Sequence, residues 1–287
     1  MLIISLLLIH CIPSVKGIDD KFTYGDGSED PDHWLGHCST GKRQSPIDIS
    51  LKNIVPTTFN NLVFTNYEKE GNVEIVNHGE TVEIHGFRNW NSEQPTISGG
   101  GLKHRYKLLQ LHFHWSDFNS NGSEHTLYGN HFPLEIHFLH VKENKTLQEA
   151  KLEQDGLMAL AVFRVITFDN RYFVDLMPGL EKMRNAESGA SIQYRMAPEK
   201  LLPLVKQMFY RYEGSLTTPG CDESVIWTLL SVPISISRDH LSVLREIRKG
   251  KYLGYPANVR PVKDLNGRKI QLQVRFGFSD NLQTANR

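Results

Sequence analysis

Short runs of alternating apolar and polar residues recur along this chain, a pattern typical of β-strands that bury one face. The clearest runs are bounded by Gly, Asn, Asp and Pro, and they predict strands over 73–76, 81–84, 107–114, 134–141 and 157–165. Helical periodicity is rarer and predicts helices over 198–212 and 237–249, with Ser237 as N-cap and Gly250 as stop. Because the strand-like runs follow one another through short connections, the sheet should be mainly antiparallel.

The domain organisation follows from the absence of a linker, repeat or low-complexity stretch, so residues 18–287 are predicted to form one mostly β (α+β) domain with a few helices. Residues 2–12 form an apolar run too short to cross a bilayer. With small residues Val15 and Gly17 before Ile18, residues 1–17 resemble a signal peptide that is removed on secretion. The positively charged residues that usually begin a signal peptide are missing, and the alternative is that this apolar run forms a buried strand.

Composition narrows the class of protein further. The 287 residues include 39% hydrophobic and 22% charged side chains, which is ordinary for a globular protein and excludes a disordered or coiled-coil chain. With 32 basic and 32 acidic residues, the chain has no charge surplus to hold nucleic acid. The polar C-terminal end carries no hydrophobic tail, so no stable membrane span is expected.

If the chain is secreted, the two cysteines that follow the apolar leader at residues 2–12 meet an oxidising environment. Cys11 lies within that leader, which leaves Cys38 and Cys221 either to pair or to remain as two buried thiols. Asn144 and Asn121 each begin an Asn-X-Ser/Thr triplet, and Asn144 is the favoured N-glycosylation site of the two.

Histidines gather in one part of the chain, seven of the thirteen falling between residues 104 and 140. Since side chains alternate along a strand, the polar face of 109–114 should carry Gln110, His112 and His114. The other face should carry Leu109, Leu111 and Phe113. A second strand places Glu135, His137 and Leu139 on one face, and pairing the two strands would bring His112, His114 and His137 together.

Three neutral imidazoles suit a zinc ion, which takes four ligands and keeps its fourth position open in catalytic sites. Gln110 and Glu135 can accept hydrogen bonds from the far ring nitrogens and so fix the tautomers. A His-x-His pair alone is more often chance on a strand surface or in a core, and the third histidine with its polar companions favours the metal site instead.

Six motifs run in order along nearly the whole chain beyond the apolar leader: 44–47 (QSPI), 110–115 (QLHFHW), 122–126 (GSEHT), 135–137 (EIH), 214–219 (GSLTTP) and 258–261 (NVRP). Together they resemble one family, the secreted, disulfide-containing α-class carbonic anhydrases. The resemblance implies a large, twisted, mainly antiparallel sheet. It also implies zinc-dependent reversible hydration of carbon dioxide to bicarbonate and a proton through a zinc-bound hydroxide.

Residue roles carried over from the resemblance are as follows. The resemblance implies zinc ligands at His112, His114 and His137. It implies that these rings are oriented by Gln110, Glu135 and the backbone carbonyl of Asn258. Thr217 and Glu124 match the pair that orients the hydroxide. The substrate wall matches Leu139, Ala159, Leu216, Thr217, Thr218, Val225 and Trp227. Cys38 and Cys221 match the family disulfide, and sulfonamide-type anions are the expected inhibitors.

One position departs from the fast members of the family, which keep a proton-shuttle histidine where this chain has Glu80. An unperturbed glutamate accepts a proton from water of pKa ~7 at an uphill cost of about 3.7 kcal/mol, whereas histidine is nearly matched. The shuttle should therefore be weakened unless His78, two residues earlier, replaces it. A zinc-free binding module and a zinc esterase acting on small esters are the alternative functions.

Overall fold

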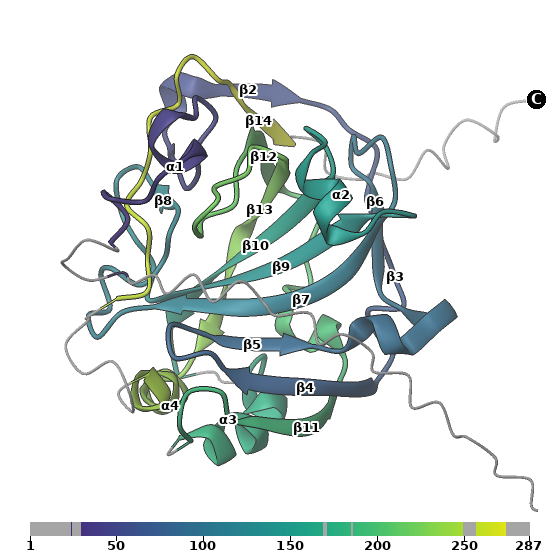
Figure 1. Cartoon of the computed structure of the whole chain (residues 1–287), viewed down its shortest axis with the longest axis vertical. Coiled ribbons are helices and arrows are strands. Elements are labelled where there is room, and N and C mark those ends of the chain that lie inside the picture. The colour runs from purple at the N-terminus through teal and green to yellow at the C-terminus, as the bar shows by residue number, and fades with distance from the viewer. Residues whose placement is uncertain (1–23, 25–29, 169–170, 185, 249–256, 274–287) are drawn as a thin grey trace, which may run out of the picture.

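The computed structural model describes Tyr24 and residues 30–168, 171–184, 186–248 and 257–273. Most of this part of the chain is β-structure, as the alternating pattern predicts (Figure 1). The strands are β1 (Asp48–Ile49), β2 (Ile54–Thr57), β3 (Leu62–Thr65), β4 (Gly71–Asn77), β5 (Val82–His85), β6 (Thr96–Gly99), β7 (Tyr106–Trp115), β8 (Thr126–Leu127), β9 (Leu134–Lys142), β10 (Leu157–Ile166), β11 (Ser191–Met196), β12 (Phe209–Gly214), β13 (Val225–Ile236) and β14 (Ile270–Gln273).

Twelve of these strands form one sheet, and ten of them follow the order β11-β4-β5-β7-β9-β10-β13-β12-β14-β2. Of the other two, β6 pairs with β7 and β3 pairs with β6. The pairs are antiparallel except β10 with β13 and β14 with β2, so the prediction of a mainly antiparallel sheet is confirmed. The long strands β7, β9 and β10 lie side by side in its middle (Figure 1). The remaining strands, β1 and β8, pair with each other in a small parallel sheet.

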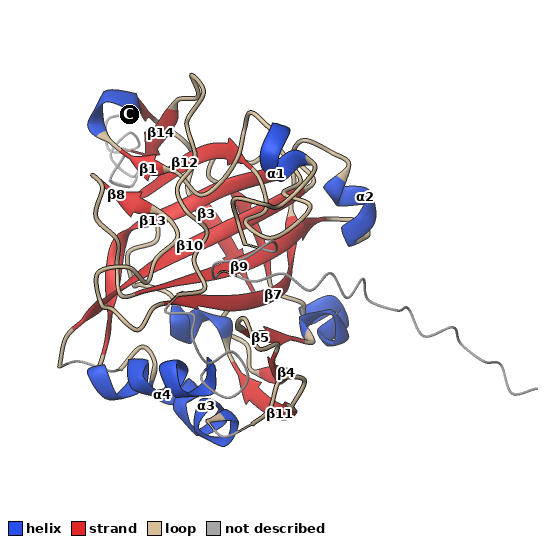
Figure 2. Ribbon diagram, turned by 60° about the vertical axis from the view of Figure 1, so that its left-hand side comes forward, coloured by secondary structure: helices blue, strands red, loops and turns tan. Residues whose placement is uncertain are grey.

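The helices are short and lie around the sheet (Figure 2). They are α1 (His37–Thr40), α2 (Leu147–Lys151), α3 (Met177–Met183) and α4 (Arg238–Arg248), with 3-10 turns at Leu51–Asn53, Phe87–Glu93, Val174–Leu176 and Pro198–Leu201. Helix α4 confirms the prediction over 237–249 within the described residues, and the backbone N–H of His240 donates to Ser237 Oγ at 3.1 Å, as an N-cap requires. Gly250 lies outside the described residues. No helix in the described part of the chain is long and apolar enough to span a membrane.

The predicted helix over 198–212 is wrong. Only Pro198–Leu201 is helical, and Phe209–Gly214 forms strand β12, which pairs with β13 on one side and with β14 on the other. Pro203 cannot donate a backbone hydrogen bond inside a helix, and the alternation of the following residues suits a strand between two neighbours. Tertiary pairing therefore overrides the weak helical pattern.

Apolar side chains pack on both faces of the sheet. The larger core includes Leu111, Phe113 and Phe138 with residues of α3 and α4, and the smaller one includes Leu139, Ala159 and Trp227. The prediction that Leu109 points with Leu111 is wrong, because the register of β7 with β9 shifts between Leu108 and Gln110. Leu109 instead packs against the smaller core. Beyond this irregularity the alternation continues to Trp115.

Candidate metal centre

Three imidazole rings come together where β7 and β9 pair. His112 lies directly opposite His137 in the register, and His114 is two residues further along the same face of β7. The ring centroids are 5.0 Å apart for His112 and His114, 5.2 Å for His112 and His137, and 4.5 Å for His114 and His137. Each ring offers one nitrogen such that the three atoms lie within 4.8 Å of one another, so the group could hold a metal ion.

The other nitrogen of each ring is held by an oxygen that can only accept a hydrogen bond. The three contacts are His112 Nδ1 with Gln110 Oε1 at 2.8 Å, His114 Nδ1 with the carbonyl of Asn258 at 2.7 Å, and His137 Nε2 with Glu135 Oε1 at 2.7 Å. Each ring therefore carries its proton on the outer nitrogen, and the lone pairs of His112 Nε2, His114 Nε2 and His137 Nδ1 remain free. Such fixed tautomers are typical of metal-ligating histidines.

Asn258 reaches the site from a loop far along the sequence. Its side chain accepts a hydrogen bond from Trp115 N at 2.7 Å and donates to the carbonyls of Phe113 at 3.0 Å and Glu80 at 2.8 Å. These contacts fix the loop against β7, so the backbone carbonyl that holds His114 cannot swing away.

Two unsatisfied buried atoms support a cation at this place. His114 Nε2 and Glu124 Oε2 are both buried, neither has a hydrogen-bond partner among the described residues, and they lie 3.5 Å apart. His137 Nδ1 lies 3.8 Å from the same carboxylate oxygen. Buried polar atoms without partners are rare in folded proteins, and a bound cation would satisfy both of these atoms. The donor set of three imidazole nitrogens fits zinc.

The protonation states suit a metal ligand set as well. Burial lowers the pKa of His112 well below its usual value, and the neighbouring charges of His114 and His137 lower it further. Burial also lowers the pKa of His114, against the opposing charge of Glu124. Both rings are therefore neutral near pH 7, the state in which imidazole can donate a lone pair.

Glu135 connects the triad to a buried hydrogen-bond network that the sequence did not predict, although His125 lies within the 122–126 motif. Its carboxylate also accepts from His125 Nδ1 at 2.7 Å and from His125 N at 2.9 Å. His125 Nε2 lies 2.7 Å from the hydroxyl of Tyr212, which contacts Ser45 Oγ at 2.8 Å. Burial raises the pKa of Glu135, but its interactions with His125 and His137, which include hydrogen bonds from both rings, outweigh burial and leave the pKa well below its usual value. Glu135 therefore remains a carboxylate that holds His137.

Thr217 and Glu124 are both buried, but no hydrogen bond joins them in the described part of the chain. Glu124 Oε1 accepts from the backbone N–H of Arg260 at 3.0 Å, which holds the carboxylate in place while its Oε2 stays free. Arg260 lies within the 258–261 motif, but its position there predicted no role for it.

Most of the predicted substrate wall gathers on the metal side of the sheet. Leu139, Ala159, Val225 and Trp227 belong to the smaller core, and Leu216 packs against it while partly exposed. The Trp227 ring centroid lies 4.8 Å from that of His137, so the apolar surface borders the imidazoles directly.

A cavity with a water-accessible volume of about 410 Å³ opens over Gln110 and Leu139. It is lined also by Glu83, His85, Gly86, Arg88, Asn89, Leu109 and Leu147. Thr218 is half-buried in the loop between β12 and β13.

The two candidate shuttle residues lie at the turn between β4 and β5. The backbone carbonyl of Glu80 bonds to Asn258, which places this residue near the base of the site. His78 is about half exposed, and its Nε2 lies 4.0 Å from Glu83 Oε2. Burial lowers the pKa of His78 and raises that of Glu83 to about 7. Glu83 pairs with His112 across the strands and also lines the cavity over Gln110 and Leu139.

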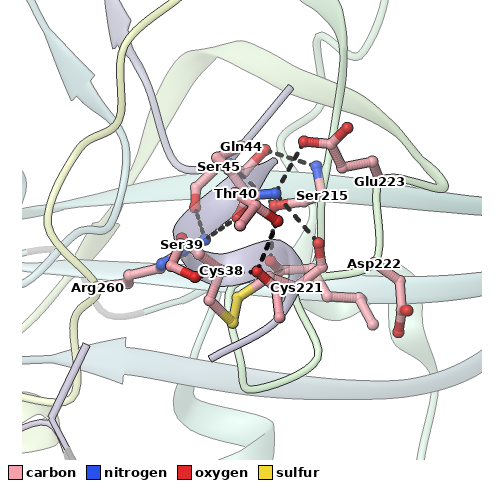
Figure 3. Close-up of a disulfide and its surroundings, with 12 residues drawn as sticks. Cys38, Ser39, Thr40, Gln44, Ser45, Ser215, Cys221, Asp222, Glu223 and Arg260 are labelled. Carbon is pink, nitrogen blue, oxygen red and sulfur yellow. Dashed lines mark hydrogen bonds between the residues drawn. A yellow bond between two sulfur atoms is a disulfide. The ribbon is translucent and has the colours of Figure 1, made fainter. Parts of the chain in front are cut away.

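Cys38 and Cys221 form a disulfide, which settles the question that the sequence left open (Figure 3). The bridge joins α1 to the loop between β12 and β13 that carries Thr217. Around it, Arg260 Nη2 donates to the carbonyl of Cys38 at 3.3 Å, and Gln44 Nε2 donates to that of Cys221 at 3.2 Å (Figure 3). The loop is thereby held against the segment that positions Glu124.

Comparison with known proteins places these features in one family. The profile of the eukaryotic-type carbonic anhydrases matches residues 29–274. The chain is 40% identical over 273 residues to putative carbonic anhydrase 5 of Caenorhabditis elegans, covering 94% of this chain and 86% of that protein. It is 32% identical over 287 residues to carbonic anhydrase 4 of Mus musculus, covering 94% and 89%. It is also 32% identical over 261 residues to carbonic anhydrase 7 of Homo sapiens, covering 88% and 97%.

Proposed function

Because this chain belongs to the eukaryotic-type carbonic anhydrase family, we propose that it binds zinc and catalyses the reversible hydration of carbon dioxide to bicarbonate and a proton. The observation that carries the proposal is the set of three imidazoles whose outer nitrogens are all fixed by acceptors and whose inner nitrogens converge. Such a set leaves room for a reactive ligand, as catalytic zinc sites do.

Zinc, when bound, lowers the pKa of a coordinated water to about 7 and so supplies hydroxide at neutral pH, a value for which this family is the standard case. The residues of the chain prepare the site for that chemistry. His112, His114 and His137 provide neutral ligands, and the carboxylate of Glu135 stabilises the positive charge that gathers at the centre. The apolar wall of Leu139, Ala159, Leu216, Val225 and Trp227 offers a place to an uncharged gas but no hydrogen bond to it.

Thr217 is proposed to orient the attacking oxygen. A hydroxyl that donates its proton to a carboxylate can only accept from its other neighbour, and Glu124 Oε2 is a buried acceptor without a partner. Thr218 would border the same substrate position. This pair stays a prediction, since no hydrogen bond joins Thr217 and Glu124 in the described part of the chain.

Replacing Thr217 separates this orienting role from simple packing. The Thr217→Val variant keeps the shape but removes the hydroxyl, and we expect kcat/KM for carbon dioxide to fall about 10²-fold, the usual effect of losing one oriented polar group. Thr217→Ser should recover most of the activity because it restores the hydroxyl. Equal rates for the valine and wild-type proteins in stopped-flow hydration would remove Thr217 from the mechanism.

The experiment that tests the function is stopped-flow carbon dioxide hydration on protein with one zinc per chain, run beside hydrolysis of an activated ester. We expect carbon dioxide to be the far better substrate. A sulfonamide should inhibit both reactions when one molecule is bound per zinc ion. A protein that takes up no zinc and hydrates no carbon dioxide would be a binding module, and one that prefers the ester would be a zinc esterase. Either result would overturn the proposal.

We also propose that internal proton transfer is slow, because Glu80 stands where fast members carry histidine. Turnover at saturating carbon dioxide should then rise several-fold as an imidazole buffer is increased at constant pH and ionic strength, since the buffer carries the proton away. Turnover that is already high and does not respond to buffer would contradict this prediction.

His78 is the residue that could relieve this limit, because its ring is half exposed and its Nε2 lies 4.0 Å from the carboxylate of Glu83, which lines the cavity over Gln110. The Glu80→His variant should raise turnover in weak buffer and reduce the response to imidazole. His78→Ala should lower turnover in weak buffer only if His78 already carries protons, and a parallel substitution at exposed His104 serves as the control.

Secretion belongs to the same proposal. We propose that residues 1–17, which lie outside the described part, are a signal peptide and that residues 18–287 form one extracellular domain. The disulfide supports an oxidising compartment. Asn144 and Asn121 are both exposed, as glycosylation requires, and Asn144 remains the favoured acceptor.

A further inference from the structure

A second cavity lies where β12 runs past the start of β14, strands that are neighbours in Figure 1. Its water-accessible volume is about 450 Å³. It is lined by Phe59, Gly101, Lys103, Asp155, Arg211, Tyr212, Glu213, Ile226, Arg268, Lys269 and Gln271. None of the zinc-ligand candidates is among these residues, so the cavity is separate from the metal centre.

Cations outnumber carboxylates around this cavity. Lys103, Lys269, Arg211 and Arg268 line it, against Asp155 and Glu213. Both carboxylates already have partners elsewhere, Asp155 with Lys142 at 2.8 Å and Glu213 with Gln154 at 2.7 Å. The side chains of Lys103 and Lys269 form no hydrogen bond or ion pair within the described residues. Arg268 donates only to backbone carbonyls. The wall therefore carries positive charge that the chain does not neutralise locally.

Arg211 is the most buried of these cations, with 5% of its surface exposed. Its Nε donates to Thr228 Oγ1 at 2.9 Å and its Nη1 to the carbonyl of Gly100 at 2.8 Å, while Nη2 has no partner among the described residues. The guanidinium also lies over the rings of Phe209 and Phe59, at 5.0 and 5.6 Å from their centroids. These contacts hold it rigidly in place, and none of them supplies a negative charge.

A buried cation without a counter-ion is costly, because burial removes its hydration without adding an opposite charge. The pKa of Arg211 reflects this, since burial lowers it to about 10. A bound anion would offset the cost. The cations lie on several sides of the cavity. A tetrahedral dianion presents oxygens in several directions and carries two negative charges, so it matches this arrangement better than a planar monoanion does.

We propose that the cavity bounded by Lys103, Arg211, Arg268 and Lys269 binds a small tetrahedral oxyanion of the phosphate class, either the free ion or the headgroup of a phosphate monoester. The two lysines supply long-range attraction from the rim, and the two arginines form the rigid part of the site. The proposal does not depend on the proposed carbonic anhydrase activity, because no residue of that reaction takes part in it.

The test is a calorimetric titration of the zinc-loaded protein with inorganic phosphate and, separately, with phenyl phosphate, at constant ionic strength. We expect saturable binding of one phosphate per chain. In the double variant Lys103→Gln/Lys269→Gln the affinity should fall about tenfold, because two attractive charges are lost. The matched control, Lys182→Gln/Lys200→Gln, removes two exposed lysines that do not line this cavity, one in α3 and one in the 3-10 turn Pro198–Leu201, and should bind as the wild type does.

The two ligands distinguish the source of the anion. Tighter binding of phenyl phosphate points to a monoester headgroup, and exclusive binding of inorganic phosphate points to the free ion, and both support the site. Absence of saturable binding, or equal weakening in the cavity variant and the control, overturns the proposal. A phosphate-dependent rise in melting temperature that persists in Arg211→Met would also overturn it, because that variant lacks the buried charge.

Discussion

Replacing His137 with alanine should abolish stoichiometric zinc binding and reduce the rate of carbon dioxide hydration by at least about 10³-fold. The variant removes one of three ligands, and without the metal the water in the site returns from a pKa of about 7 toward that of bulk water. The loss also leaves Glu135 with one imidazole partner instead of two. Metal analysis of the purified protein and stopped-flow hydration are the two measurements.

The matched control for this variant is His104→Ala. His104 belongs to the same histidine-rich stretch of the sequence, but it is exposed and lies 3.3 Å from Asp155, away from the triad. Its replacement should leave zinc content and turnover unchanged. A His137→Ala protein that retains one zinc per chain and near-normal turnover would show that the metal is held elsewhere, and the assignment of the triad would fail.

Of the substitutions proposed for this chain, removal of the disulfide should cause the largest loss in the free energy of unfolding. The bridge between Cys38 and Cys221 spans 183 residues, and the chain-entropy relation for such a loop gives a stabilisation of about 5 kcal/mol, a ceiling that measured values often do not reach. We expect the Cys38→Ser/Cys221→Ser protein to lose several kcal/mol in the free energy of unfolding, measured by urea denaturation. Activity should fall as well, because the bridge holds the loop that carries Thr217.

Ser39→Ala is the control for this experiment. Ser39 is in the same helix as Cys38, and its hydroxyl donates only one local hydrogen bond, to the carbonyl of Gly36 at 3.1 Å. Its loss should cost less than about 1 kcal/mol. Equal stability of the serine double variant and the wild type under oxidising conditions would show that the bridge contributes nothing to the folded chain.

Local patterns in the sequence account for the long strands and for the way they present the histidines. Alternation along β7 and β9 is a short-range property of extended chains, so the common face of Gln110, His112 and His114 could be predicted before any pairing was known. The same reasoning failed at Leu109, because a register shift changes the face of a residue without changing the sequence around it. It failed over 198–212 because strand β12 is stabilised by partners distant in the sequence.

Contacts between distant segments decided the rest. The carbonyl of Asn258 meets His114 across 144 residues, the two cysteines pair across 183, and Arg211 comes to line a charged cavity with residues from several loops. Composition and spacing fixed which side chains were available for zinc, and the resemblance to a family indicated their roles. Which atoms face one another, and which cation is left without a counter-charge, depends on how the whole sheet packs, because burial and partner choice are properties of the folded chain rather than of any short stretch.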